Sequence, residues 1–318
     1  MPFAERQLIA SIRRAAKLRS SALVTGIGDD CAVLRVPRAH EAIVTTDFSL
    51  EGVHFRREWH PAESVGHRCL TRGLSDIAAI GGEPLAAFLS LALPNDLDQS
   101  WADEFLKGLL ALARRHKLPL AGGDIAQSPA GVLADITVLG SVPKGRAVLR
   151  STARPGDLVY VTGALGASAA VIEALYAGLQ LDRSKLDAHF YPQPQLAVGR
   201  YLRENRIATA MIDVSDGLST DLTHICDESR VGAVINENAI PLAALTTPRV
   251  NLRHALHGGD DYQLLFTARP KASVPKRIAG VVITQIGEIT LRRKLLIRGA
   301  DESSRELKSE GWQHFQEQ

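Results

Sequence analysis

The order of strand-like and helix-like segments is the feature that most limits the fold of this chain. Short apolar runs with alternation or β-branched residues predict strands, and longer amphipathic runs between them predict helices. The predicted strands are 32–36, 42–46, 133–139, 158–161, 210–214, 263–267 and 281–286, and the predicted helices are 65–80, 101–116, 167–179, 195–204 and 218–227. Because strands and helices do not alternate one for one, this order favours mixed sheets covered by helices, an α/β fold of the α+β type, over a doubly wound parallel sheet.

The chain is long enough for two domains, because its 318 residues exceed the usual size of one hydrophobic core. The segment VPKGRAVLRSTARPGD at 142–157 carries turn formers and charge between two apolar runs, and Pro155 with Gly156 breaks any regular element there. We therefore predict a boundary near residues 141–153, between a first domain at 1–145 and a second at 146–318.

Charge and cysteine usage exclude several classes of protein. The 37 basic and 35 acidic side chains are mixed along the chain, so no nucleic-acid-binding surface is predicted. The most apolar stretch, 77–93, is broken by Gly-Gly-Glu-Pro at 81–84, so no membrane-spanning helix is predicted. Cys31, Cys69 and Cys226 lie far apart without a CxxC pair, which argues against a disulfide framework or a zinc site and favours a reducing compartment, the cytoplasm.

The first 18 residues, MPFAERQLIASIRRAAKL, are amphipathic and begin with charge rather than with the apolar core of a secretory signal. A mitochondrial-type presequence could look similar. Glu5 and the helical spacing of Leu8, Ile12 and Ala15 favour a structural helix.

Aspartate recurs in turns beside predicted strands and glycines. The segments are GIGDD, TTD, SDIAAIGG, AGGD, DVSDG and HGGDD, which contain Asp29, Asp30, Asp47, Asp76, Asp124, Asp213, Asp216, Asp260 and Asp261. Each segment alone is ordinary turn chemistry. Together, carboxylates spread over several loops are what a protein needs to hold more than one Mg²⁺ around a polyphosphate, because Mg²⁺ prefers oxygen ligands. The histidines do not cluster at metal spacing, so zinc or iron is disfavoured.

Two of these segments carry more information than their composition. Asp76 lies seven residues after Cys69 in a predicted helix, on the side of buried-type residues, where a carboxylate is costly unless it is paired or binds a cation. Strand alternation sends Asp213 and Ser215 to one face, and Asp216 lies in the turn that opens the next helix. A helix N-cap at Ser215 or Asp216 and a metal site are both open interpretations.

The chain lacks the usual nucleotide-binding signatures. It contains no Gly-Lys pair, so it has no GxxxxGK loop, and it lacks the protein-kinase motifs. If ATP is the phosphate donor, Mg²⁺ and backbone amides must hold its phosphates. The GALGAS turn at 163–168 could present N–H groups to an anion, or could be only a tight strand-to-helix connection.

In order and spacing, GIGDDCAVL, VTTDFSLEGVHF, LSDIAAIGG, AGGD, RSTARPGD, DVSDGL and GGDDYQLLF resemble the motifs of the thiamine-monophosphate kinase family. This family shares a superfamily with aminoimidazole ribonucleotide synthetase and selenophosphate synthetase. The match runs through nearly the whole chain, to GWQHF at 311–315. It implies a two-domain aminoimidazole ribonucleotide synthetase-like fold and a homodimer built largely through the first domains. It also implies direct in-line transfer of the ATP γ-phosphoryl group to thiamine monophosphate, with several Mg²⁺ ions.

The resemblance also implies roles for particular residues. The first domain would bind ATP and Mg²⁺ and form the dimer, and the second would complete the nucleotide and thiamine phosphate site. The implied metal ligands are Asp30, Thr45, Thr46, Asp47, Asp76, Asp124, Asp213 and Asp216. The implied ATP contacts are Gly123, Asp124, Arg150 and Ser215, the acceptor contacts are His54, Asp260 and Trp312, and the catalytic residues are Asp47, Asp124 and Arg150.

Two positions depart from the family pattern. GGDD stands where GGED is common, which shortens the acid at Asp260, and Leu106 stands where an aromatic residue is expected beside Phe105, so no adenine contact is assigned there. The related enzymes fit less well. Cys31 lies inside the GDD strand rather than at the place of a selenophosphate synthetase cysteine, and the chain ends in Gln318 rather than in the cysteine of the hydrogenase-maturation enzymes. A non-catalytic nucleotide-binding protein on this fold would have lost carboxylates that are all present here.

Overall fold

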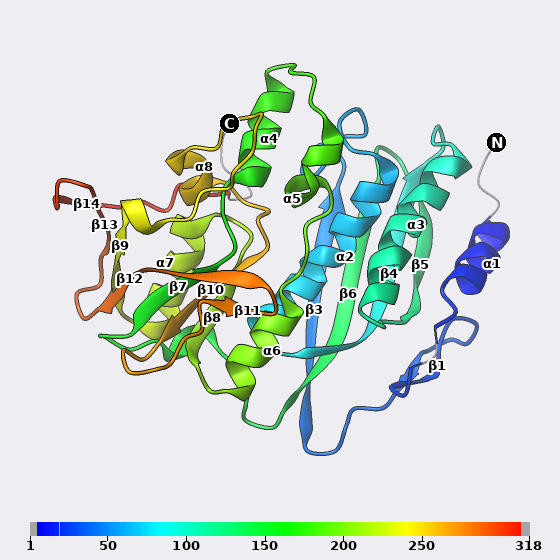
Figure 1. The fold of residues 1–318 in the computed structure, drawn as a ribbon. Helices are drawn as coiled ribbons and strands as arrows, with labels where there is room; N and C mark the ends of the chain where they lie inside the picture. The colour runs from blue at the N-terminus through cyan, green and yellow to red at the C-terminus, as the bar shows by residue number, and fades with distance from the viewer. Residues whose placement is uncertain (1–4, 19, 313–318) are drawn as a thin grey trace. The chain divides into compact units, whose positions relative to one another are not determined.

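The computed structural model describes residues 5–18 and 20–312, and they divide into two compact units (Figure 1). Unit 1 comprises Met1–Ile77, Gly82–Gly145 and Phe190–Pro192. Unit 2 comprises Ala78–Gly81, Arg146–His189 and Gln193–Gln318. Residues 78–81 belong to unit 2 although the residues before and after them belong to unit 1, and residues 190–192 belong to unit 1 between two segments of unit 2. The sequence did not predict these two exchanges.

Unit 1 is built on a four-stranded mixed sheet of order β3-β6-β4-β5. The strands β3 (His40–Leu50), β6 (Leu133–Pro143) and β4 (Glu83–Pro94) are antiparallel neighbours, and β5 (Leu120–Ser128) runs parallel to β4. Helices α2 (Ala62–Ala79) and α3 (Gln99–Arg115) lie side by side against the sheet (Figure 1). The unit also contains α1 (Glu5–Ala15) and a small hairpin of β1 (Leu23–Thr25) and β2 (Val33–Leu34).

The two faces of this sheet differ because strand side chains alternate between them. On β6, Ala134, Ile136 and Val138 are fully buried on the helix side. On β3, Val44 and Phe48 point to the other face and are 63% and 55% exposed. One face therefore carries a helix-covered core, and the other is open in the single chain.

The contact between α2 and α3 depends on two glycines. A Cβ atom at Gly66 would lie 1.9 Å from the carbonyl oxygen of Phe105, and one at Gly108 would lie 1.9 Å from that of Glu63. Since any larger residue would collide with backbone, the two helices cross at a distance that only these glycines allow.

Unit 2 contains a mixed eight-stranded sheet with helices on both faces. The strand path is β14-β13-β9-β12-β7-β10-β8, with β11 paired to β12, and only the β13–β9 pair of this sheet is parallel. The strands are β7 (Leu158–Thr162), β8 (Ala208–Val214), β9 (Gly232–Asn236), β10 (Gln263–Ala268), β11 (Arg277–Ile278), β12 (Val281–Thr290), β13 (Leu295–Arg298) and β14 (Ser304–Glu306). The helices are α4 (Ala167–Tyr176), α5 (Asp187–Phe190), α6 (Leu196–Glu204), α7 (Leu218–Ser229) and α8 (Leu252–His257).

Two apolar cores lie on the two faces of this sheet. Leu218, Leu222 and Ile225 of α7 pack with β-strand residues in one core, and Val198 and Leu202 of α6 pack in the other. This arrangement, with mixed sheets and covering helices, confirms the predicted fold class.

The predicted elements are all present, with ends that differ by a few residues, but several strands were missed. Among them are β4, β5, β9 and β13. In β4, the sequence EPLAAFLSLALP has proline at its second position and is apolar at most positions, so it shows no alternation to mark a strand. In β5, two glycines interrupt the apolar pattern.

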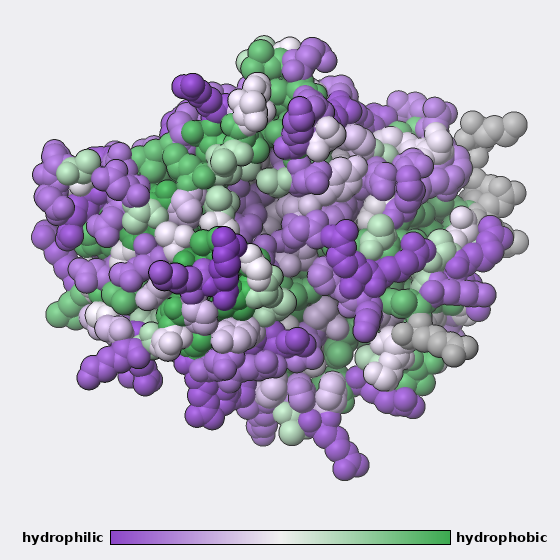
Figure 2. Space-filling model, in the orientation of Figure 1, coloured by the Kyte–Doolittle hydropathy of each residue, from purple (hydrophilic) through white to green (hydrophobic). Residues whose placement is uncertain are grey.

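Figure 2 shows polar and charged side chains over most of the visible face, with apolar residues in smaller patches. Within the described residues, we find no helix that combines the length and the apolar composition needed to cross a membrane.

The GALGAS turn connects β7 to α4, and its amides face a side chain of the protein itself. The carboxylate of buried Asp261 accepts hydrogen bonds from the backbone N–H groups of Gly166, at 2.7 Å, Ala167 and Ser168. The interpretation as a strand-to-helix connection is therefore the right one. Burial raises the pKa of Asp261 to about 7, although these backbone donors act to lower it.

This raised pKa predicts a pH-dependent stability. Between pH about 4 and about 7, folded Asp261 keeps a proton that the unfolded chain releases, so its contribution to stability falls as the pH rises through this window. In urea unfolding, the free energy of the wild type minus that of Asp261→Asn should decrease by about 2 to 3 kcal/mol from pH 5 to pH 7. Other titrating groups cancel in this difference. A difference that stays constant with pH would contradict the assignment.

Candidate functional site

A cavity of about 460 Å³ in unit 1 brings together two of the aspartate motifs. The GIGDD loop, which connects β1 to β2, contributes Asp29 and Asp30, and β5 contributes Gly123 and Asp124. Apolar side chains of α1, β4 and β5 form the remaining wall. The structure therefore places the predicted residues Asp30, Gly123 and Asp124 around one space of small-molecule size.

Gly123 sets the shape of this wall. Its φ is +148°, and a Cβ atom there would lie 1.8 Å from the carbonyl oxygen of Leu89 on β4. Only glycine permits this approach of β5 to β4. The following residue, Asp124, is exposed, and its Oδ1 accepts a hydrogen bond from the N–H of Ile125 at 2.9 Å.

A second group lies on the helix side of the sheet. The hydroxyl of Thr45 on β3 donates a hydrogen bond to Oδ2 of Asp76 on α2. Asp47 follows two residues later on the same side of β3, near buried Cys69. Burial raises the pKa of Cys69 to about 12, and the Asp47 charge acts in the same direction, so this cysteine stays a thiol. The sequence predicted that the Asp76 carboxylate would be paired or would bind a cation, and the Thr45 hydroxyl is one such partner.

Thr46 belongs to the opposite, open face. Its hydroxyl donates a hydrogen bond to Oδ1 of Asp135 on β6 at 2.8 Å. Since Thr45 and Thr46 point to different faces, their two hydroxyls cannot hold the same ion. Asp135 was not among the predicted residues, although it alternates with buried apolar residues in LADITVL and pairs in register with Ser90, which in turn pairs with Asp124.

The carboxylates of unit 2 gather where β8 leads into α7. Asp216 and Asp221 each offer an oxygen, and His224 a ring nitrogen, within 4.8 Å of one another. Asp221 is buried, accepts a hydrogen bond from the N–H of Asp216 at 3.2 Å, and has a pKa raised well above its ordinary value by burial and then by the charges of Asp213 and Asp216. Sequence reasoning missed Asp221, which could have been found by its place one turn into the helix that follows DVSDG.

The N-cap interpretation of Ser215 and Asp216 is wrong. The N-cap residue of α7 is Gly217, with φ +107°, so neither Ser215 nor Asp216 occupies the N-cap position.

Four predicted residues of unit 2 come together at this loop. The N–H of Asp260 donates to the carbonyl oxygen of Ser215 at 2.8 Å, and the N–H of Trp312 donates to that of Asp216 at 3.0 Å. Asp260 has a left-handed backbone, φ +62°, and its Oδ1 accepts a hydrogen bond from the hydroxyl of buried Tyr262 at 2.5 Å. The residues predicted to bind the acceptor and those predicted to bind metal thus share one loop region.

Two other predicted residues lie apart from these groups in their own units. The carbonyl of Arg150 accepts a hydrogen bond from Ser229 at the far end of α7, about 16 Å along the helix from its start. The ring of His54 lies at the end of β3, where its Nδ1 accepts a hydrogen bond from the N–H of Leu50 at 3.0 Å.

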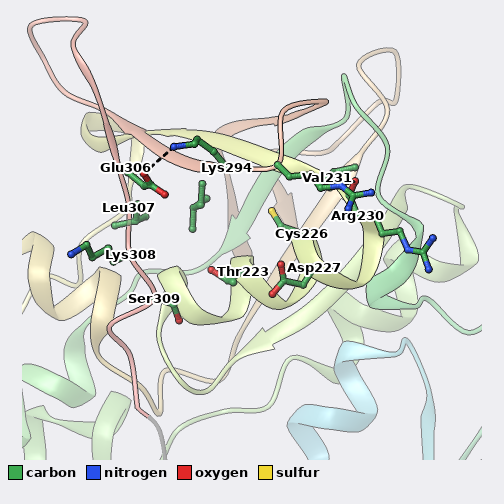
Figure 3. A pocket seen from close by; sticks show the side chains of 12 residues that line it. Thr223, Cys226, Asp227, Arg230, Val231, Lys294, Glu306, Leu307, Lys308 and Ser309 are labelled. Atoms are coloured by element: carbon green, nitrogen blue, oxygen red, sulfur yellow. Dashed lines mark hydrogen bonds and ion pairs between the residues drawn. The ribbon is translucent and has the colours of Figure 1, made fainter.

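Unit 2 also holds a cavity of about 420 Å³ beside the second half of α7 (Figure 3). Cys226 lies at its floor, Lys294 forms an ion pair with Glu306 at 3.2 Å above it, and the segment 306–309 forms one wall. None of the predicted site residues lines this cavity.

The chain matches known proteins over most of its length. Residues 28–142 match the model of the AIR synthase related protein N-terminal domain, and residues 154–297 match the C-terminal domain. The thiamine-monophosphate kinase of Salmonella typhimurium is 39% identical over 285 residues, 86% of this chain and 84% of that protein.

Solved structures give the same relationship. The thiamine-monophosphate kinase of Stenotrophomonas maltophilia K279a is 32% identical, with a TM-score of 0.81 over 93% of this chain and 97% of that one. AaThiL in complex with AMPPCP and TMP is 30% identical, with a TM-score of 0.78 over 98% and 97%. The chain therefore belongs to the thiamine-monophosphate kinase family of AIR synthase related proteins.

Proposed function

We propose that this chain is an ATP-dependent kinase that phosphorylates thiamine monophosphate to thiamine diphosphate. The observation that carries the proposal is the unit 1 cavity, where the GIGDD loop and Gly123–Asp124 surround a space of about 460 Å³. The family relationship supplies the substrates, since relatives of this name cover most of the chain and AaThiL was solved with AMPPCP and TMP.

The donor groups fit Mg²⁺. Apart from His224, the side chains gathered in the two units offer carboxylate and hydroxyl oxygens, the hard ligands that this ion prefers. We propose that Asp30, Thr45, Asp47, Asp76 and Asp124 in unit 1, and Asp213 and Asp216 in unit 2, hold several ions, with Thr46 serving a separate position on the open face. Bound Mg²⁺ would neutralise negative charge on the phosphates.

The remaining residues bind and orient the substrates in this proposal. Gly123, Asp124, Arg150 and Ser215 contact ATP, and Arg150 adds positive charge for the transferring group. His54, Asp260 and Trp312 contact thiamine monophosphate. Tyr262 holds the carboxylate of Asp260 in place through its hydroxyl.

The reaction needs no protein base. The acceptor is a phosphate monoester that is already ionised near neutral pH, so its oxygen attacks the γ-phosphorus of ATP directly and ADP leaves. The obstacle is repulsion between two anions, which the chain reduces by positioning and by charge neutralisation. We assign this role to Arg150 directly, and to Asp47 and Asp124 through the Mg²⁺ ions that they would hold.

We also propose a cytoplasmic homodimer. The open face of the unit 1 sheet exposes Val44 and Phe48, which a second copy of the chain could cover. Cys31, Cys69 and Cys226 are free thiols, as suits a reducing compartment.

The direct test is an assay of purified protein with ATP, Mg²⁺ and thiamine monophosphate. Thiamine diphosphate should form, excess EDTA should abolish its formation, and added Mg²⁺ should restore it, because the site lacks a phosphate-binding lysine loop. Absence of the product in the complete mixture would overturn the proposal, and full turnover in EDTA would overturn the role of the metal.

Asp260→Asn should separate acceptor recognition from folding. Asparagine tolerates the left-handed backbone of this position, so the variant should fold, whereas alanine would add strain. Asparagine keeps an acceptor oxygen but removes the negative charge, so a charge-assisted hydrogen bond becomes a weaker neutral one, and the KM for thiamine monophosphate should rise about fivefold to tenfold. The KM for ATP should change less than about twofold.

Tyr262→Phe is the matched control, because it frees the Asp260 carboxylate without removing it. This variant should raise the same KM by a smaller factor. An unchanged acceptor KM in Asp260→Asn, together with a lower melting temperature, would show that Asp260 is only a turn residue.

The dimer can be tested with Val44→Glu combined with Phe48→Glu. Buried carboxylates in an apolar contact are strongly unfavourable, so the double variant should be monomeric in sedimentation while the wild type is dimeric. Leu291→Glu, at an apolar residue of unit 2 that is 81% exposed, should leave the dimer unchanged. A monomeric wild type or a dimeric double variant would contradict the proposed interface.

A further inference from the structure

We infer that the C-terminal segment 307–312 is a structural strap that positions the Asp216 loop, and that Thr220 is the positioning residue that fastens it. This inference rests on the proposed function for its kinetic consequences, but its structural part can be tested without activity.

The strap follows a defined path over α7. After β14, the N–H of buried Leu307 donates to the carbonyl oxygen of Leu295 at 2.9 Å. The chain then passes α7, as the stretch 306–309 in Figure 3 shows. The strap reaches the junction of β8 and α7, where the N–H of Trp312 donates to the carbonyl oxygen of Asp216 at 3.0 Å.

Thr220 makes two of the contacts that hold this path. It lies in the first turn of α7 and is buried, 3% exposed. Its hydroxyl accepts a hydrogen bond from the N–H of Gly311 at 3.1 Å and shares another with the hydroxyl of Ser309 at 3.0 Å. One buried side chain thus ties both ends of the stretch 309–311.

Gly311 lets the strap lie directly on the loop. A Cβ atom at this position would be 2.1 Å from the carbonyl oxygen of Asp216 and 2.4 Å from the Thr220 hydroxyl. Any other residue would have to lift the strap from the loop, which would break the hydrogen bonds on either side.

Hydrogen bonds hold the two peptide groups that flank Asp216. Its N–H donates to the Asp221 carboxylate, and its carbonyl oxygen accepts the N–H of Trp312. The peptide groups around the proposed metal ligand are therefore held by α7 on one side and by the strap on the other. The strap also sets the backbone position of Trp312, the proposed acceptor contact, so it links acceptor binding to the metal loop.

Fluorescence of Trp312 tests the structural part. The sequence has three tryptophans, so Trp59→Phe with Trp101→Phe leaves Trp312 as the only one. In this background, Thr220→Val should make Trp312 about twofold or more easier to quench with acrylamide, because the loss of each hydrogen bond shifts the docking equilibrium about twofold to tenfold. Thr220→Ser should behave as the parent.

The matched control is Thr223→Val, one turn further along α7. The Thr223 hydroxyl donates to the carbonyl oxygen of Ser219 inside the helix at 2.7 Å, so its loss weakens α7 without freeing the strap. Quenching in Thr220→Val that equals that of the parent or of Thr223→Val would overturn the inference.

Gly311→Ala provides a second, independent variant, which decides the question if Thr220→Val does not fold. It should raise quenching at least as much. Gly299→Ala should not, because its new methyl group would lie nearest to the flexible Asp301 side chain, at 2.9 Å, and no closer than 3.8 Å to Ser303. In the kinase assay without the tryptophan substitutions, Thr220→Val should raise the KM for thiamine monophosphate about threefold to tenfold, with rescue by Thr220→Ser. If Thr220→Val increases Trp312 quenching but the wild-type chain has no kinase activity, the proposed function is overturned and the inference about the strap still holds.

Discussion

The pleat of the unit 1 sheet is the constraint on which the candidate site depends. Because successive side chains of β3 point to opposite faces, Thr45 and Asp47 lie on the helix side and Thr46 lies on the open side. On the helix side, the half-buried carboxylate of Asp76 accepts a hydrogen bond from a β3 hydroxyl, which offsets part of the cost of its burial. The open side can keep the exposed carboxylates, and it also leaves the apolar residues that a second chain could cover.

Unit 2 meets the same difficulty of crowded negative charge in another way. Its carboxylates stand at the junction of a strand and a helix, where backbone N–H groups are available. Asp221 takes the N–H of Asp216, and Asp261 takes three N–H groups at the start of α4. Both have raised pKa values because burial outweighs these donors. At Asp221, which also feels the charges of Asp213 and Asp216, this crowding favours the binding of a cation, as the proposed kinase requires.

Glycine is the residue that brings backbone segments close enough for this. Gly123 allows β5 to approach β4 beside the unit 1 cavity, and Gly311 allows the C-terminal strap to lie on the Asp216 loop. Both glycines stand next to a residue with a proposed role, Asp124 in one unit and Trp312 in the other. In the family motifs AGGD and GW, the glycine therefore allows a close approach of two backbone segments, and the residue beside it carries the proposed chemical role.

The sequence alone determined the class of fold and the family, and it predicted the main set of carboxylates, because hydrophobic periodicity is local and the motifs stand in a characteristic order. It could not show which carboxylates share a space, since that depends on pairs such as Thr46 and Asp135, which are 89 residues apart and meet only in the sheet. For the same reason it missed Asp135 and Asp221, and it left open both the N-cap of α7 and the partner of the GALGAS amides. Only the tertiary structure decided these points, because strand register, helix docking and burial arise from contacts between distant segments, and these contacts determine the surroundings of each polar side chain.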